Sequence, residues 1–163
     1  MSQPEQRGID PRGPRFGAGI TAVLLLVTIF LALLPTAGAK LAAFVLLIVI
    51  ALLFAWGTFA GIQRHPYGLL FKNLVRPRLA PPAELENPAP PTFAQFVGLL
   101  FTGVGVILGA GGVEWGVWLF AAFAFVAAFL NSVFAYCLGC QIYLLLAHAG
   151  LLGRSRRGET LHA

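Results

Sequence analysis

Charged side chains are scarce in this sequence: Asp, Glu, Lys and Arg make up 10% of its 163 residues. A soluble domain carries about 25%, so this chain lacks the polar groups needed to cover a globule in water. Hydrophobic residues make up 58% of the chain, and the mean hydropathy is +0.83. The composition excludes intrinsic disorder and most soluble folds, and it predicts a protein that lies in a lipid bilayer.

Asp, Glu, Lys and Arg are absent from four long apolar stretches, which cover residues 16–34, 41–62, 93–113 and 117–147. A bilayer core about 30 Å thick needs about 20 helical residues. Membrane strands would alternate apolar and polar residues, whereas residues 43–50 are apolar on every face. We therefore predict an all-α integral membrane protein with four transmembrane helices. Ion-coupled transport is disfavoured, because it usually requires an ionisable side chain within a span.

Basic residues indicate the orientation in the membrane. Ten of the eleven lie in three segments: Arg7, Arg12 and Arg15, then Arg64, Lys72, Arg76 and Arg78, and finally Arg154, Arg156 and Arg157. Short basic segments stay in the cytoplasm, so we expect a multi-pass protein of the bacterial cytoplasmic (inner) membrane with both termini inside. The first apolar stretch is longer than the core of a cleavable leader, so we expect it to remain as the first span.

The predicted organisation has three parts. Residues 1–15 form a cytoplasmic arm, residues 16–147 form the membrane domain with two tight outer turns, and residues 148–163 form a cytoplasmic tail. A long cytoplasmic loop covers residues 63–92, and its Pro-rich part, residues 77–91, should run extended rather than helical. This part either docks a partner or serves as a stiff strap.

Small and polar residues within the spans have two interpretations each. Gly57 and Gly61, and also Gly105 and Gly109, have the GxxxG spacing of close helix packing, within the bundle or with a second copy of the chain. Asn131 is expected near the middle of the fourth span, where it either lines a substrate path or makes an interhelical hydrogen bond. His65 and His148 are read as interfacial residues, with ligation of a metal as the alternative.

Both cysteines of the chain lie in one motif, Cys137-Leu138-Gly139-Cys140. Cys137 follows Trp118 by 19 residues, which is about 28 Å along a helix and places the pair at the cytoplasmic end of the fourth span. Residues three apart share a helix face, so both sulfurs should point the same way. In a reducing cytosol we expect them to rest as thiols.

Three interpretations of Cys137 and Cys140 remain open. The first is redox exchange through a mixed disulfide, with Gly139 allowing the sulfurs to approach. A helix C-terminus opposes this, because it disfavours a thiolate and a regular helix holds the two Cβ atoms too far apart. The second is soft-metal binding, completed by His148, a second chain or a partner. The third is that both are small buried hydrophobic side chains.

Three parts of the chain carry a family resemblance: residues 9–16, the loop from Pro66 through Glu86 to Gln95, and Phe129-Leu130-Asn131 together with Cys137–Cys140. In these parts the sequence resembles the small bacterial membrane proteins catalogued as domain of unknown function 4395. The resemblance covers nearly the whole chain and implies a four-helix integral membrane protein. Genes of that family can lie near genes for thioredoxin-like proteins and sulfurtransferases, so the resemblance suggests such a partner.

We therefore hypothesise that Cys137 and Cys140 take part in thiol–disulfide or sulfur-related exchange with a thioredoxin-like protein or a sulfurtransferase at the cytoplasmic face. The rival hypothesis is a non-enzymatic scaffold or assembly subunit with structural cysteines, whose glycine faces and Pro-rich loop bind other proteins or a second copy. No cofactor and no nucleic-acid partner is predicted. The sequence has no phosphate-binding loop, and its basic residues are split among three segments.

Overall fold

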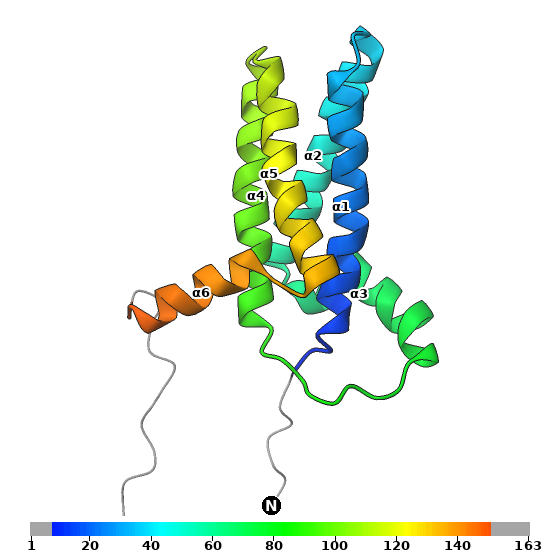
Figure 1. The fold of residues 1–163 in the computed structure, drawn as a ribbon, viewed down its shortest axis with the longest axis vertical. Coiled ribbons are helices and arrows are strands. Elements are labelled where there is room, and N and C mark those ends of the chain that lie inside the picture. The colour runs from blue at the N-terminus through cyan, green and yellow to red at the C-terminus, as the bar shows by residue number, and fades with distance from the viewer. Residues whose placement is uncertain (1–7, 151–163) are drawn as a thin grey trace, which may run out of the picture.

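Four long helices form an antiparallel bundle in the computed structural model, which describes residues 8–150. The helices are α1 (Arg12–Leu33), α2 (Ala37–Phe59), α4 (Ala89–Ala110) and α5 (Glu114–Phe134). They form a ring in which α1 contacts α2, α2 contacts α4, α4 contacts α5 and α5 contacts α1 (Figure 1). All four are long and apolar enough to cross a membrane, and residues 8–150 contain no β-strand. The predicted all-α membrane fold is confirmed.

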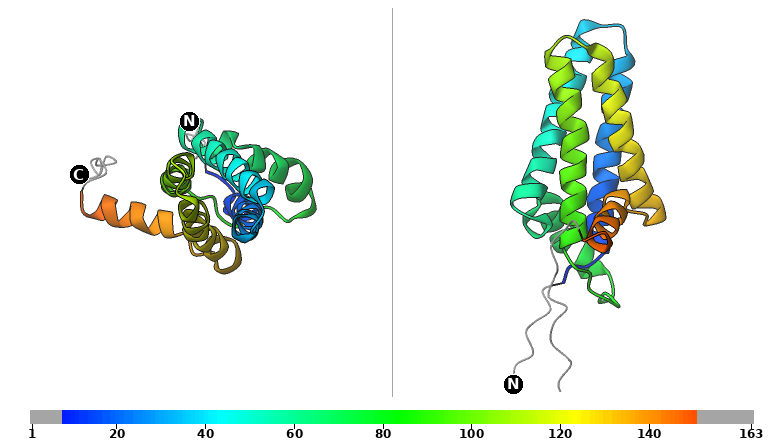
Figure 2. Two further views of the ribbon diagram at one scale, coloured as in Figure 1. Left: turned by 90° about the horizontal axis from the view of Figure 1, so that it is seen from above. Right: turned by 90° about the vertical axis from the view of Figure 1, so that its left-hand side faces the viewer.

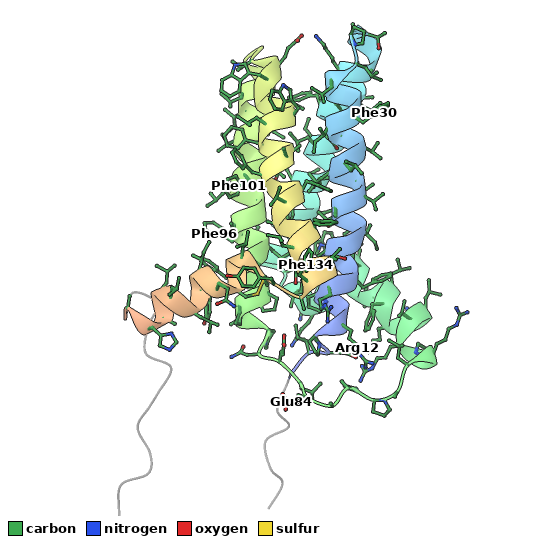
Figure 3. The ribbon with its side chains drawn as sticks, in the orientation of Figure 1. Arg12, Phe30, Glu84, Phe96, Phe101 and Phe134 are labelled. Carbon is green, nitrogen blue, oxygen red and sulfur yellow. A yellow bond between two sulfur atoms is a disulfide. The ribbon has the colours of Figure 1, made fainter. Side chains whose placement is uncertain are left out.

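The outer surface of the bundle is apolar along its length. Phe30 of α1 is 65% exposed and points away from the bundle (Figure 3), and Ile107 of α4 is 71% exposed. Side chains of this size are rarely left exposed in such numbers where water is the solvent. They are the surface that faces the lipid tails.

A small core fills the half of the bundle nearer the two tight turns. Its buried members come from α1, α2 and α5: Leu25, Ala43, Leu47, Ile50, Val117, Ala121 and Ala124. Helix α4 approaches closely through glycine, because a Cβ on Gly105 would lie 3.0 Å from Leu47 and one on Gly109 would lie 2.7 Å from Val117. The GxxxG pair in α4 therefore packs the bundle itself. Gly61 has another role: it follows α2 with a φ of +82° and has no neighbour within 4 Å.

The prediction of one continuous helix over residues 117–147 is wrong. Helix α5 ends at Phe134, and Ala135 takes the left-handed conformation, with a φ of 57°. A separate helix, α6 (Leu138–His148), then runs sideways from the end of the bundle, across the direction of the other helices (Figures 1 and 2). Asn131 consequently lies in the last turn of α5 and not in the middle of a span.

The long loop is more helical than predicted. After α2 come four short helical turns: η1 (Ile62–Arg64), α3 (Pro66–Leu70), η2 (Phe71–Val75) and η3 (Arg76–Arg78). The expectation that residues 77–91 exclude helix is wrong at both ends, because Pro77 lies in η3 and α4 starts at Ala89 with Pro90 and Pro91 in its first turn. Proline suits that turn, whose N–H groups have no partner within the helix. The extended part shrinks to residues 79–88, called the strap below.

The strap is tied to the residues that precede α1. Ile9 and Glu86 exchange two backbone hydrogen bonds of 2.9 Å. Arg12 donates two side-chain hydrogen bonds to Asp10, of 2.9 and 2.8 Å, and a third of 3.0 Å to the carbonyl of Ala80. Figure 3 shows Arg12 at the base of α1, above the loop that carries Glu84. The strap thus closes the end of the bundle opposite the tight turns. Arg7 and the predicted tail beyond Gly150 lie outside the described residues.

Candidate functional site

The two cysteines form a disulfide at the start of α6, with their Cα atoms 5.1 Å apart. This differs from the predicted resting thiols. Cys137 precedes the helix in an extended conformation, with φ −88° and ψ 101°, and Cys140 lies in its first turn. Because Cys137 is outside the helix, the spacing that keeps two Cβ atoms apart on a regular helix does not apply. The break after α5 is therefore what allows the two sulfurs to meet.

The polarity of the helix end is also opposite to the prediction. The motif begins a helix, whereas the sequence placed it near a C-terminus. The Cys137 sulfur accepts a hydrogen bond of 3.2 Å from the backbone N–H of Cys140, as an N-capping side chain does. The N-terminal end of a helix stabilises negative charge. When the disulfide is reduced, the helix therefore favours a thiolate on Cys137.

Gly139 fixes the motif against α4. A Cβ at this position would lie 2.6 Å from both Cα and Cβ of Ala94, which no side chain accommodates without a shift of backbone. Gly139 has no left-handed φ. Its role in the structure is therefore close packing of α6 on α4.

A cavity of about 920 Å³ lies beside the disulfide. It occupies the half of the bundle that the core leaves empty, between α1, α4, α5 and the start of α6. Small residues are frequent in its wall: Gly13, Gly17, Ala18, Ala94, Gly98, Ala124, Ala127 and Ala128. Cys137 is part of the wall, and Asp10 and Leu85 lie at the end closed by the strap. The disulfide therefore borders a ligand-sized space with mainly apolar walls.

A few polar side chains line this cavity. Gln95 of α4 and Asn131 of α5 are half-buried in its wall, and within residues 8–150 neither side chain makes a hydrogen bond. Tyr67 of α3 is hydrogen-bonded to Thr21, and burial raises the pKa of its phenol. The interhelical hydrogen bond expected of Asn131 is not formed among the described residues. Asn131 instead lines a cavity, which agrees with the other interpretation, a polar residue that lines a path for a substrate.

His65 is a structural residue at the edge of this cavity. It is 3% exposed, its Nε2 lies 3.1 Å from the carbonyl of Leu53, and its Nδ1 accepts a hydrogen bond of 3.3 Å from the N–H of Tyr67. Since Nε2 must donate to the carbonyl of Leu53 while Nδ1 accepts from Tyr67, the ring is neutral and carries its proton on Nε2. Burial lowers the pKa of His65 from its usual 6.5, although the bond to Leu53 opposes this.

We expect acidification to destabilise the protein through His65. In the unfolded chain His65 takes up a proton at a pH near 6.5, whereas in the folded chain it does so only at a lower pH. The free energy of unfolding therefore falls as the pH drops below about 6.5. One such group gives at most about 1.4 kcal/mol per pH unit. Melting of the detergent-solubilised protein between about pH 8 and about pH 5 measures this slope. The dependence of stability on pH should weaken in His65→Asn and persist in His148→Asn, since His148 is exposed. An unchanged pH dependence in His65→Asn would show that His65 is not the group responsible.

A metal site at the cysteines finds no support in the described part of the chain. Among residues 8–150 no three His, Cys, Asp or Glu side chains gather to hold an ion. His148 was a candidate third ligand, but it ends α6, about 15 Å along the helix from the cysteines. A metal would need ligands from a second chain or a partner.

The sequence did not reveal the cavity or the strap's closure. Ala94 and Gly98, and likewise Gly13 and Gly17, repeat at a spacing of four, which is a signal of close packing. The spacing does mark close packing here, because a Cβ on Gly98 would collide with the ring of Phe54 and Gly139 packs on Ala94, so it gives no sign of the cavity. No curated protein and no solved structure matches this chain. The family model for the domain of unknown function DUF4395 matches residues 9–148. The match begins at Ile9, which pairs with Glu86 of the strap, and ends at His148 at the end of α6. The chain is thus a member of the DUF4395 family.

Proposed function

We propose that this protein carries out thiol–disulfide exchange through Cys137 and Cys140 with a thioredoxin-like protein at the membrane surface. The single observation that carries the proposal is the position of the disulfide at the N-terminus of α6, with Cys137 as the capping residue. A structural disulfide would join distant parts of the fold, whereas this one closes a loop of four residues. It restrains little of the unfolded chain.

The exchange conserves atoms and electrons. A thiolate of the reduced partner attacks the Cys137 sulfur, the bond to Cys140 breaks, and Cys140 leaves as a thiolate that takes up a proton. The second partner thiol then attacks the mixed disulfide and releases Cys137 as a thiolate. The partner leaves oxidised and this protein holds two thiols; the reverse sequence oxidises it again.

The cytoplasmic face is the proposed location of the exchange. The motif lies at the same end of the bundle as α3 and the strap, together with Arg64, Lys72, Arg76 and Arg78. The opposite end carries Lys40, paired with Glu114. Basic segments stay inside, so a partner in the cytoplasm of a bacterial cell would meet Cys137 there.

A trapping experiment tests both the exchange and its side. Inverted membrane vesicles that contain the reduced Cys140→Ser variant are mixed with a thioredoxin that keeps one motif cysteine, blocked as a thionitrobenzoate disulfide. Cys137 should displace the yellow thionitrobenzoate anion and leave a covalent complex that Cys140 cannot resolve. We expect thionitrobenzoate to be released roughly tenfold or more faster than from the same adduct of glutathione, because a protein partner makes binding contacts that glutathione does not make.

Cys137→Ser is the matched control, since Cys140 remains and the capping sulfur is lost. It should react at least about tenfold more slowly. Equal rates for the two variants, or equal rates with thioredoxin and glutathione, would overturn the proposal in favour of structural cysteines. Reaction in right-side-out spheroplasts and not in inverted vesicles would place the motif on the outer face.

A further inference from the structure

The cavity beside the disulfide is where a second reaction partner of the cysteine pair, an electron acceptor, would bind. A thiol pair that exchanges with one partner must pass its electrons to another, or it stops after one turnover. The wall of this cavity includes Cys137. We propose that the cavity binds a lipid-soluble quinone, which takes two electrons and two protons from the cysteines as their disulfide forms; this rests on the proposed exchange function.

Size and lining fit such a molecule. About 920 Å³ falls within the range of about 300–1,000 Å³ for ligand sites, enough for a quinone ring and the first units of its tail. Phe54, Phe101 and Phe123 supply apolar and aromatic walls, and Phe101 and Phe123 are also exposed on the bundle surface. The cavity wall is therefore continuous with the lipid-facing surface, so a ligand dissolved in the membrane can reach it without crossing water.

Two amide side chains in the wall can donate hydrogen bonds to the carbonyl oxygens of a quinone ring. The amides of Gln95 and Asn131 have N–H groups that no described residue accepts, and they come from two different helices. Amide donors bind a neutral carbonyl without the cost of burying a charge. Lys72 and Arg76 also line the cavity, so a phospholipid whose phosphate they bind is the competing occupant, and the experiment below distinguishes it from a quinone.

The electron transfer balances without any other reagent. Two thiols lose two electrons and two protons and form one S–S bond, and the quinone gains the same and becomes a quinol. Because Cys137 and not Cys140 is part of the cavity wall, the Cys137 thiolate adds to a ring carbon of the quinone. The Cys140 thiolate then attacks the Cys137 sulfur, so that the S–S bond forms, the C–S bond to the ring breaks with its electron pair left on the ring, and the ring takes up the two thiol protons to become the quinol. The thiolate form that this step needs is the one favoured at the start of α6.

Binding is tested on the purified full-length protein with decylubiquinone, a benzoquinone with a ten-carbon tail. Ala127→Phe fills the cavity and should weaken binding at least about tenfold. Ala42→Phe is the matched control, because Ala42 is exposed on α2 and lines no part of the cavity. Asn131→Leu keeps the volume and removes the amide, so it should weaken binding even if Ala127→Phe fails to fold.

Electron transfer is tested separately by the loss of quinone absorbance on mixing with the reduced protein. One quinol should form per disulfide, and none in Cys137→Ser/Cys140→Ser, which should still bind the quinone. Absence of binding overturns this inference and leaves the thioredoxin trap unaffected. Binding without quinol formation overturns the redox step, as does recovery of phospholipid alone from the cavity. If the protein binds the quinone but forms no trapped complex with thioredoxin, the proposed exchange function is wrong and the quinone-binding site stands.

Discussion

Replacing Gly139 with alanine is expected to displace the start of α6 and to abolish most of the thiol exchange. The new Cβ would lie 2.6 Å from the backbone and Cβ of Ala94, so α6 and α4 must separate. Overpacking of this kind costs about 1–3 kcal/mol. Since the break before α6 brings the sulfurs together, a shift there also separates Cys137 from the helix end and from the cavity.

Gly103→Ala is the matched control for Gly139→Ala. Both glycines lie in helices, but a Cβ on Gly103 meets nothing within 4 Å. We expect Gly103→Ala to keep its stability, because alanine is the better helix former. Unfolding in mixed micelles gives the free energies, and the thionitrobenzoate release rate gives the exchange. A Gly139→Ala variant with unchanged stability and unchanged rate would show that the contact with Ala94 does not position the motif.

Replacing Arg12 with methionine is expected to release the strap. Arg12 joins Asp10, 9% exposed, to the carbonyl of Ala80. Without it the Asp10 carboxylate loses its cation in a place with little water, and Ala80 loses its donor. Arg12 lowers the pKa of Asp10 below its usual 3.8, so this stabilisation is present at neutral pH and is lost only as the pH falls below that value.

Proteolysis within the strap measures this release. Cleavage between residues 79 and 88 should accelerate on the order of tenfold in Arg12→Met, because local opening controls the rate. Arg15→Met is the control: it removes a cation from the same helix, one for which the described residues show no hydrogen bond or ion pair. Similar cleavage in both variants would show that the Ile9–Glu86 bridge, and not Arg12, holds the strap.

The residues that line the cavity come from all four long helices, from the segment between α2 and α4, and from the start of α6. This limited how much of the site the sequence could reveal. The cysteine motif is local, so its residues were identified directly. Asn131 was identified as a polar residue within the fourth apolar stretch, but its predicted depth in the membrane was wrong because the sequence predicted a helix that continues beyond Phe134. Gln95 was noted only as part of the family resemblance and not as a site residue, since a single glutamine near the start of an apolar stretch resembles any helix end.

The membrane class, the four spans and the asymmetry of the basic residues follow from the sequence alone, because hydropathy and charge act over whole segments and do not depend on tertiary contacts. The end of the fourth span depends on tertiary packing. The apolar run passes through Ala135, Tyr136 and Cys137 without a proline or glycine, so no local signal marks the turn. Gly139 packs against Ala94, a residue 45 positions away in the chain. This close contact places the start of α6, with the disulfide and the Cys137 part of the cavity wall, beside α4.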